Sequence, residues 1–416
     1  MEKAKSRTSI YSGAVLAMSI SITSMTMGFG IFGPFLPLYA ELLGASMGLQ
    51  IGLLTAGFML TRTLTSTPFG ILSDRIGRKN TIVLGLFAYG IITLTFVIAT
   101  HWTHLVILRT FQGITAGMIW PASRALIVDE RGPGVRGRAL ALFNSASFGG
   151  IVVGPALGGL LQLFARESLG YTILESFRFP FYFAGMLGIL SAVIALLTIK
   201  ELKHSRNRSD KVWNNLFKYI STKFRMTYYS FLLIYFAHGF SFGLLHPVLV
   251  LYIEHNLGLS REETAGIAAI TFSLAALSNS LSILGGGRLA DTMNRKNILI
   301  FCIIVAQFAT ISLAFAKDIS LILILIVIRS AMNGLYLPSI TSMEGDMVPR
   351  NVRGRLTGVS ETFRGIGAMT GPLIGFAFYD FVSTGSPFIL AGIISLISVI
   401  VLYILGKEPT REEAEQ

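Results

Sequence analysis

Six charged residues stand inside long apolar stretches of this sequence, where a charge is costly. They are Arg62, Arg109, Arg124, Arg329, Glu361 and Arg364. In lipid such a side chain costs at least ~2.5 kcal/mol, so it usually faces a partner, a cavity or a water-filled path. A guanidinium binds carboxylate or phosphate groups, and a carboxylate can carry a proton. The chemistry that these residues predict is the binding of a polar solute or an ion within a membrane.

Uncharged polar side chains accompany them in the same stretches. The candidate cavity and coupling residues are Arg62, Arg109, Gln112, His238, His246, Asn279, Arg329, Asn333, Glu361 and Arg364. Glu361 and Arg364 are three residues apart, so on a helix they either neutralise each other or leave Glu361 to carry a proton. A histidine is the other candidate proton carrier, because the ordinary pKa of imidazole lies near neutrality.

The elements that must position these groups are membrane-spanning helices. Of 416 residues, 52% are hydrophobic and only 13% are charged, and the mean hydropathy is +0.66. Apolar stretches of about 20 residues each predict a spanning helix. Twelve such stretches lie near 12–39, 49–72, 80–99, 103–128, 138–164, 178–199, 228–254, 264–289, 297–316, 320–343, 355–380 and 386–406. We therefore expect an all-α polytopic membrane protein with twelve transmembrane helices.

The lysines and arginines fix the expected orientation. With both termini placed in the cytoplasm, 25 of the 34 basic residues fall on the cytoplasmic side, four outside and five within spans. This bias follows the positive-inside rule and predicts a multi-pass protein of the cell membrane. The net charge of +12 is spread over short clusters between spans, so we expect no nucleic-acid partner. The first stretch is too long for a signal-peptide core, and we interpret it as the first spanning helix.

An internal repeat relates the two halves at one constant offset, which carries Gly70 onto Gly287. The matched residues of the first region are Gly70, Leu72, Asp74, Arg78, Lys79 and Asn80 with Gly287, Leu289, Asp291, Arg295, Lys296 and Asn297. Farther along, Asp129 matches Asp346 at the same offset, and the run 135–138 matches 352–355. Two similar halves of six helices around a central cavity are typical of secondary transporters.

The segment Gly70 to Lys79 reads G-I-L-S-D-R-I-G-R-K. It resembles the G-x-L-x-D-R-x-G-R-K motif of the major facilitator superfamily, and the looser second copy at 287–296 supports the resemblance. That likeness covers essentially the whole chain and implies the fold of this family, with two pseudo-symmetric six-helix bundles.

The resemblance also implies a conformational latch at the cytoplasmic ends of the helices. Its candidate residues are Gly70, Asp74, Arg75, Arg78, Asp129, Asp291, Arg295 and Asp346. By analogy with the family, Asp74 meets the start of the eleventh helix and Arg78 pairs with Asp129. Symmetry then pairs Arg295 with Asp346. Such contacts close one side of a transporter in one state and break in the other.

A helix-packing motif occupies the fifth stretch, where Gly150, Gly154, Pro155 and Gly158 stand. Glycines four residues apart form one smooth stripe, which favours close packing, and proline adds a kink. The motif resembles the G-x-x-x-G-P-x-x-G-G signature of drug:proton antiporters, and a partial copy recurs in the eleventh stretch. Similarly, Arg109 and Gly113 resemble the R-x-x-x-G motif of the fourth helix, whose arginine is linked to proton coupling; the alternative is a structural hydrogen-bonding arginine.

The predicted cavity departs from the pattern of exporters for lipophilic cations. Those exporters commonly place a carboxylate within the first, seventh or tenth helix. Here Glu41 and Glu254 stand only at outer ends, and the tenth stretch has Asn333. The arginines expected to point into the cavity are Arg62, Arg109 and at least one of Arg329 and Arg364. The cavity is thus expected to be basic and to favour anionic, zwitterionic or neutral solutes.

The resemblance implies a proton-coupled antiporter that exports small organic or amphiphilic solutes. The alternative on the same fold is an uptake or exchange carrier for an anionic metabolite or a sugar, because fold does not decide function. A receptor or an enzyme is disfavoured, since no nucleotide loop, metal cluster or nucleophile constellation is evident. The single cysteine, Cys302, excludes a disulfide framework and a cysteine-based metal site.

The expected organisation is an N-terminal bundle over 1–199, a basic cytoplasmic linker over 200–227 and a C-terminal bundle over 228–416. The expected partners are a small-molecule substrate and the lipid bilayer. We expect a monomer without a cofactor or metal, driven by the proton gradient.

Overall fold

The computed structural model describes residues 13–130, 136–199, 220–348 and 353–408, and within these ranges it contains helices and no strands. The helices of the first half are α2 (Gly13–Phe32), α3 (Leu36–Leu42), α4 (Gly48–Ile76), α5 (Arg78–Thr95), α6 (Trp102–Glu130), α7 (Arg136–Glu167) and α8 (Ile173–Thr198). Those of the second half are α9 (Arg225–Leu257), α10 (Arg261–Thr292), α11 (Arg295–Ser312), α12 (Ile319–Met347), α13 (Arg353–Phe381) and α14 (Ser386–Leu405). Each of the predicted stretches is a helix, and α2 and α3 share the first, which confirms the predicted fold class.

The first stretch is divided where one continuous helix was predicted. The α2 helix ends at Phe32, and α3 begins at Leu36. Gly33 and Pro34 stand between them. Proline has no N–H to donate, and its ring clashes with the carbonyl four residues earlier, so the helix ends there.

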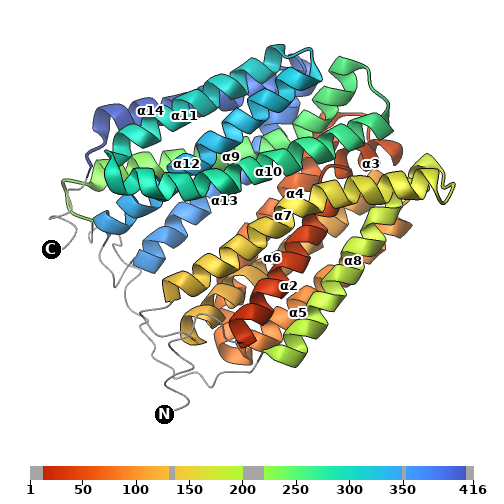
Figure 1. The fold of residues 1–416 in the computed structure, drawn as a ribbon, viewed down its shortest axis with the longest axis horizontal. Coiled ribbons are helices and arrows are strands. Elements are labelled where there is room, and N and C mark those ends of the chain that lie inside the picture. Colours follow the sequence, from red (N-terminus) through yellow and green to blue (C-terminus); the bar gives the residue numbers. More distant parts are fainter. Residues whose placement is uncertain (1–12, 131–135, 200–219, 349–352, 409–416) are drawn as a thin grey trace. The chain divides into compact units, whose positions relative to one another are not determined.

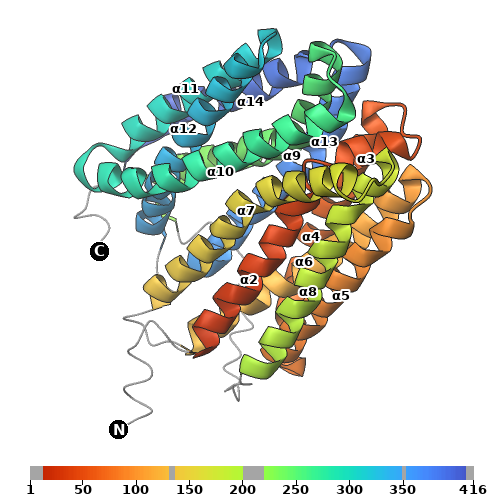
Figure 2. The same cartoon turned by 45° about the vertical axis from the view of Figure 1, so that its right-hand side comes forward.

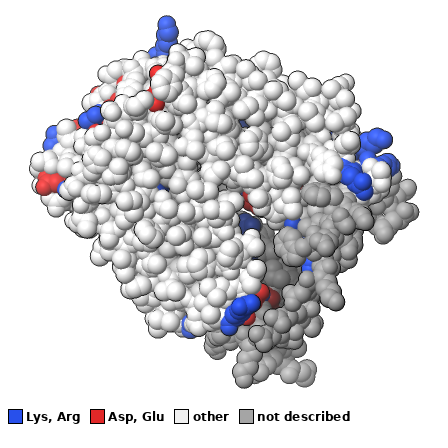
Figure 3. Space-filling view, turned by 180° about the vertical axis from the view of Figure 1, so that it is seen from behind, with Lys and Arg blue, Asp and Glu red and all other residues white. Residues whose placement is uncertain are grey.

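The helices carry the apolar character expected of membrane spans. Among the described residues, nine helices are long and apolar enough to cross a membrane. The α4, α6 and α13 helices are equally long but more polar, and they hold Arg62, Arg109 and the Glu361–Arg364 pair. Most of the face drawn in Figure 3 is neither basic nor acidic. Large apolar side chains such as Leu84 and Ile400 are more than half exposed, as is appropriate for contact with lipid.

The internal repeat is visible in the helix bounds themselves. Moving α5 by the offset that carries Gly70 onto Gly287 gives 295–312, the bounds of α11, and moving α6 gives 319–347, the bounds of α12. The short 3₁₀ helices that extend α5 and α11, η1 (Phe96–Ile98) and η3 (Leu313–Phe315), also coincide at this offset. These two pairs of helices therefore share not only motifs but also lengths and endings.

The chain divides into two compact units. The first comprises residues 1–205 with 259–273, and the second comprises 206–258 with 274–416. In the first unit α2 packs against α7 and α8, and α4 packs against α6 (Figures 1 and 2). In the second unit α9 packs against α13 and α14, and α11 packs against α12. The pairing of α2 with α7 and of α9 with α13 follows the repeat.

The glycine motif of α7 lies in the tight contact with α2. A Cβ atom added to Gly154 would lie 2.6 Å from the Met27 carbonyl oxygen, and one added to Gly158 would collide with the Ile31 carbonyl. In the second unit a Cβ on Gly371 would likewise collide with the carbonyl of Phe240 in α9. The stripe therefore lets two backbones approach closely, which is how small residues join helices in lipid.

Part of the predicted linker falls outside the described residues, namely 200–219. Its remaining residues approach the second unit, where Ile220 and Phe224 are buried in the apolar core around Tyr228 and Phe231. The α9 helix then begins at Arg225. These residues anchor the entry of the chain into the second unit.

Candidate functional site

Arg109 of α6 is enclosed inside the first unit by aromatic rings. Its guanidinium carbon lies 5.3, 5.4 and 4.8 Å from the ring centres of Phe29, Phe32 and Phe58. The side chain is only 4% exposed. A cation held over aromatic faces is attracted to their negative charge, which offsets part of the loss of hydration.

Gln112, one turn after Arg109, connects this arginine to the neighbouring helix. The Arg109 Nη1 donates to Gln112 Oε1 at 3.2 Å, and Gln112 Nε2 donates to Thr93 Oγ1 of α5 at 2.8 Å. The buried Nε of Arg109 has no hydrogen-bond partner among the described residues. The predicted neighbours Arg109 and Gln112 thus form one polar site that keeps an unused donor in an apolar surrounding.

Arg62 lies on α4 beside a different aromatic group. Its guanidinium carbon is 5.8 Å from the ring of Trp120, and Arg124 approaches the same ring at 5.7 Å. Arg124 is exposed, in agreement with the expectation that it reaches toward water. Arg62 is partly buried and lies over this indole, whereas Arg109 lies among phenylalanine rings. Two basic groups therefore share one indole in the first unit.

A polar pocket lies inside the second unit between α9, α11, α12 and α14. Its polar lining includes His238, Ser241, Gln307, Arg329, Asn333 and Tyr336. Arg329 Nη2 donates to Ser241 Oγ at 3.0 Å, and its buried Nε has no hydrogen-bond partner among the described residues. The free space is about 10 Å³ for the centre of a water molecule, about what one water needs. The pocket therefore brings together three of the predicted candidates, His238, Arg329 and Asn333. Arg329 is the residue that offers it the most hydrogen-bond donors.

The remaining uncharged candidates have separate positions. His238 Nδ1 and the Tyr336 hydroxyl are 2.5 Å apart. His246 is exposed and pairs with the carbonyl of Phe242 at 3.1 Å, so it lies apart from the pocket lining. Asn279 donates to the Ser330 carbonyl at 3.1 Å and thereby joins α10 to α12.

Glu361 and Arg364 of α13 form an ion pair with each other, and two guanidinium nitrogens of Arg364 contact Glu361 Oε2. Of the two alternatives expected for this pair, mutual neutralisation is thus the one that the structure contains. Both side chains remain about two-fifths exposed within the described chain. An arginine partner binds the ionised form of a carboxylate, which leaves Glu361 less suited to exchange a proton.

The structure adds a buried carboxylate that sequence reasoning missed. Glu344 of α12 is 4% exposed and accepts hydrogen bonds from Tyr235 at 2.8 Å and from Ser360 at 2.7 Å. The predicted tenth span ends at 343, one residue before Glu344. In the sequence Glu344 therefore looks like part of the polar helix end, as Asp346 does. The signal that would have found it is the register of α12, because Glu344 lies eight residues after Tyr336 and shares its face.

The first latch motif forms the ion pairs expected of it. Arg78, at the start of α5, contacts Asp129 at the end of α6, and its Nη2 lies 3.1 Å from Asp74 Oδ1. Gly77 has φ of 100°, a conformation that favours glycine and turns the chain between α4 and α5. Arg75 is exposed and makes no ion pair among the described residues. Arg78 is therefore the cation that joins the helix ends.

The second latch motif repeats this arrangement with an additional partner. Arg295 Nη1 lies 2.5 Å from Asp346 Oδ2, and its Nε lies 3.2 Å from Glu408 Oε1. Glu408 also accepts from the backbone N–H of Arg295 at 3.0 Å, so it occupies the N-terminus of α11. Where the first copy has Gly77, the second has Asn294 with φ of −65°, and its side chain caps α11 by accepting from Asn297. One of the two departures of the second motif, Asn294 in place of glycine, is thus a change of cap; the other is Thr292 in place of arginine.

The predicted contact of Asp74 with the start of the eleventh helix involves residues of both units, and it stays a prediction. The repeat of the Arg–Asp pair, in contrast, lies within each unit and is present in both. Gly70 meets Pro121 of α6 at an ordinary distance of 3.7 Å from an added Cβ, and Asp291 precedes Arg295 by one turn.

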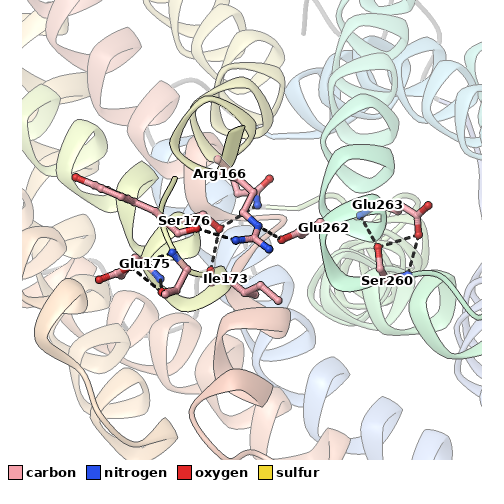
Figure 4. A network of polar contacts seen from close by, with 10 residues as sticks. Arg166, Ile173, Glu175, Ser176, Ser260, Glu262 and Glu263 are labelled. Carbon is pink, nitrogen blue, oxygen red and sulfur yellow. Dashed lines mark hydrogen bonds and ion pairs between the residues drawn. The ribbon is translucent and has the colours of Figure 1, made fainter. Parts of the chain in front are cut away.

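At the other ends of the helices, the first unit contains a polar network that includes the beginning of α10. Arg166 Nε donates to Glu262 Oε1 at 2.7 Å, and Arg166 Nη1 donates to the carbonyl of Tyr171 at 2.9 Å (Figure 4). Close by, Glu175 caps the start of α8 and Glu263 caps the start of α10. Because Arg166 and Glu262 are about two-fifths exposed, their pair is worth at most about 1 kcal/mol.

The pattern of paired six-helix halves and repeated motifs at the helix ends agrees with a comparison to known families. The sequence profile of the Major Facilitator Superfamily matches residues 18–234 and again residues 231–416. The chain belongs to the Major Facilitator Superfamily. It is therefore a multi-pass membrane protein of a family of transporters, and its twelve predicted spans are those of that fold.

Relatives within the superfamily cover nearly the whole chain. Multidrug resistance protein 2 of Bacillus subtilis (strain 168) is 26% identical over 378 residues, which cover 90% of this chain and 90% of that protein. Quinolone resistance protein NorA of Staphylococcus aureus (strain COL) is 26% identical over 406 residues, which cover 94% and 96%. A bacterial homologue of the human lysosomal transporter Spinster, solved in an inward-facing and occupied conformation, matches with a TM-score of 0.75 at 18% identity, over 96% and 97% of the two chains.

Membership of the superfamily gives the observed sites their context. Members bind small-molecule substrates within the lipid bilayer, and in such proteins ionisable side chains inside spans mark substrate or ion pathways. Arg109 in the first unit and Glu344 in the second are buried charged groups of this kind, and the partly buried Arg329 lines the polar pocket of the second unit.

Proposed function

We propose that this chain is a proton-coupled antiporter that exports small organic or amphiphilic solutes across the cell membrane, with both termini in the cytoplasm. The observation that carries the proposal is the likeness to Multidrug resistance protein 2 and Quinolone resistance protein NorA over nine-tenths of the chain. Their names describe drug resistance, for which removal of the drug from the cell is a direct physical means. The protein acts with its substrate, the bilayer and the proton gradient, and needs no cofactor.

The buried groups support this function physically. Coupling requires at least one group that can exchange a proton inside the membrane, and substrate binding requires donors or acceptors that are not used by the protein itself. Arg329 keeps an unused buried donor in the polar pocket, and carboxylates stand nearby in the same unit. The Arg–Asp pairs at the helix ends in each unit are contacts that alternating access can make and break.

Transport by purified protein in liposomes tests the proposal. With an acidic lumen, an antiporter exchanges lumenal protons for external solute, so norfloxacin, a fluorescent zwitterionic quinolone, is expected to accumulate inside. Dissipation of the gradient by an uncoupler is expected to abolish the accumulation. Protein-free liposomes measure the passive trapping of the drug. Accumulation that instead requires an alkaline lumen would identify a symporter and favour the uptake carrier for anions or sugars.

The charge of the site makes a second prediction about the substrate. A guanidinium attracts carboxylates and repels cations, so anionic, zwitterionic or neutral solutes are expected to be better substrates than a bare lipophilic cation. Replacement of Arg329 or Arg62 by Gln is expected to reduce this preference at least about fivefold, since a charge-assisted hydrogen bond contributes about 1.5–3 kcal/mol.

Competition in the same liposomes measures the preference. Ethidium is compared with an anionic and a neutral solute in the wild type, in Arg62→Gln and in Arg329→Gln. The variant Arg124→Gln is the matched control, because Arg124 is exposed and shares the indole of Trp120 with Arg62. If ethidium is the better substrate and neither Arg62→Gln nor Arg329→Gln changes the ratio, the electrostatic interpretation is wrong.

A further inference from the structure

We infer that Glu344 is the carboxyl group that takes up and releases the coupled proton. The inference rests on the proposed antiport and names its proton-exchanging residue. Glu344 lies on α12 within the second unit, among apolar residues such as Met343 and Tyr228, and it is 4% exposed. Among the described residues, no basic side chain forms an ion pair with it.

The partners of Glu344 are hydroxyl groups, and this distinguishes it from the other carboxylates of the unit. Tyr235 Oη donates to Oε2 at 2.8 Å, and Ser360 Oγ donates to Oε1 at 2.7 Å. A hydroxyl group can donate to an ionised carboxylate or accept from a protonated one, so this site retains its hydrogen bonds in both states. An arginine offers donors and a positive charge, and thus it favours the ionised state. Glu361 has such a partner in Arg364.

Exchangeable groups extend from Glu344 in two directions. On one side Ser360 lies 3.3 Å from the hydroxyl of Tyr228, which stands one turn from the start of α9 at Arg225. On the other side Tyr235 lies in the same buried core as Tyr336, which pairs with His238 in the polar pocket. The carboxyl group therefore stands between the end of the bundle and the pocket that holds Arg329.

The helices around Glu344 carry charged and titratable groups of their own. The α9 helix contributes Tyr228 and Tyr235, and α13 contributes the Glu361–Arg364 pair. From α11, Arg295 contacts Asp346 of α12 and Glu408. Each of these cations contacts another carboxylate, so a change in the proton occupancy of Glu344 changes the net charge of this region by one.

The coupling of this charge to transport follows from burial. An ionised carboxylate without a cation is costly in an apolar core, and a protonated one is not. A conformational change that admits water to Glu344 favours release of the proton, whereas closure favours its uptake. The same carboxyl group then takes up a proton on one side of the membrane and releases it on the other. Only O–H bonds form and break in this step.

Two measurements on the full-length protein test this assignment. In the infrared spectrum, a carboxylic acid C=O band that disappears as pH rises is expected in the wild type and in Glu361→Gln, but not in Glu344→Gln. In liposomes, Glu344→Gln is expected to lose accumulation of norfloxacin driven by the pH gradient while it still exchanges external for lumenal norfloxacin without a gradient. Loss of driven transport with intact exchange is the signature of a coupling residue, which a purely structural role does not produce.

Variants of the two hydroxyl partners cover the case in which Glu344→Gln does not fold. Tyr235→Phe and Ser360→Ala each remove one hydrogen bond and are expected to slow driven transport about fivefold, with exchange retained. The assignment is overturned if the band persists in Glu344→Gln, or if that variant retains wild-type driven transport. If the wild type shows the Glu344 band but no response to a pH gradient, the proton site stands and the proposed antiport fails.

Discussion

Replacement of Arg78 or Arg295 by Ala is expected to reduce transport at least about tenfold, because each arginine joins two helix ends at a contact that we propose the transport cycle makes and breaks. Arg78 contacts Asp129 and Asp74, and Arg295 contacts Asp346 and Glu408. Removal of a well-buried cation takes an ion-pair partner from each carboxylate that it contacts, and since these carboxylates are partly exposed we expect a cost of about 2 kcal/mol, below the range for fully buried pairs. Initial rates of driven transport in liposomes and thermal unfolding in detergent measure the two effects.

Arg75 provides the matched control for this prediction. It belongs to the same motif, three residues before Arg78, but it is exposed and makes no ion pair within the part of the chain that the structure describes. Arg75→Ala is expected to transport within about twofold of the wild type, as for surface substitutions in general. The neutral variants Asp74→Asn and Asp129→Asn separate the two partners of Arg78. Wild-type turnover in Arg78→Ala and Arg295→Ala would show that neither ion pair is a latch.

Substitution of Gly150 by Val is expected to prevent correct packing of α7 against α2. A Cβ atom at this position would lie 2.5 Å from the carbonyl oxygen of Thr23 and 2.8 Å from the backbone nitrogen of Met27, and backbone atoms cannot move aside as side chains do. We expect a destabilisation of about 3 kcal/mol or more. Gly367→Val in the second unit is expected to act similarly, because its Cβ would meet the backbone of Phe236 and Phe240.

The neighbouring Gly149 makes the experiment specific. A Cβ added to Gly149 meets no described atom within 4 Å, so Gly149→Val is expected to change stability by about 0.5 kcal/mol or less. Both variants are compared by the yield of monodisperse protein and by the midpoint of thermal unfolding. Equal behaviour of Gly149→Val and Gly150→Val would contradict the packing role of the stripe.

The helices were predictable because lipid imposes a simple rule on sequence. Every backbone group must be paired inside the membrane, so an apolar stretch of sufficient length becomes a helix, and the predicted stretches did. The internal repeat also predicted the Arg295–Asp346 pair from the Arg78–Asp129 pair. The break after Phe32 was missed because hydropathy does not register a single proline.

The site was less predictable, since it depends on which side chains meet across helices. The proximity of Arg109 and Gln112 was evident from their spacing of three residues, but the cage of Phe29, Phe32 and Phe58 combines two other helices. Glu344 was overlooked because a carboxylate near the end of a span looks like one in a loop. Its burial depends on Tyr235 and Ser360, which come from distant parts of the chain.

The shared bounds of α5 with α11 and of α6 with α12 bear on the ancestry of the molecule. A duplicated gene begins with two identical halves, and later changes act on each half separately. At the offset of the repeat, Glu344 corresponds to Ile127 and Arg109 corresponds to Ile326, yet the helices that hold them begin and end at equivalent residues. The helix bounds have therefore stayed alike in the two halves while the side chains that could do chemistry have come to differ. The first half now holds an arginine caged by aromatic rings, and the second half holds a buried acid.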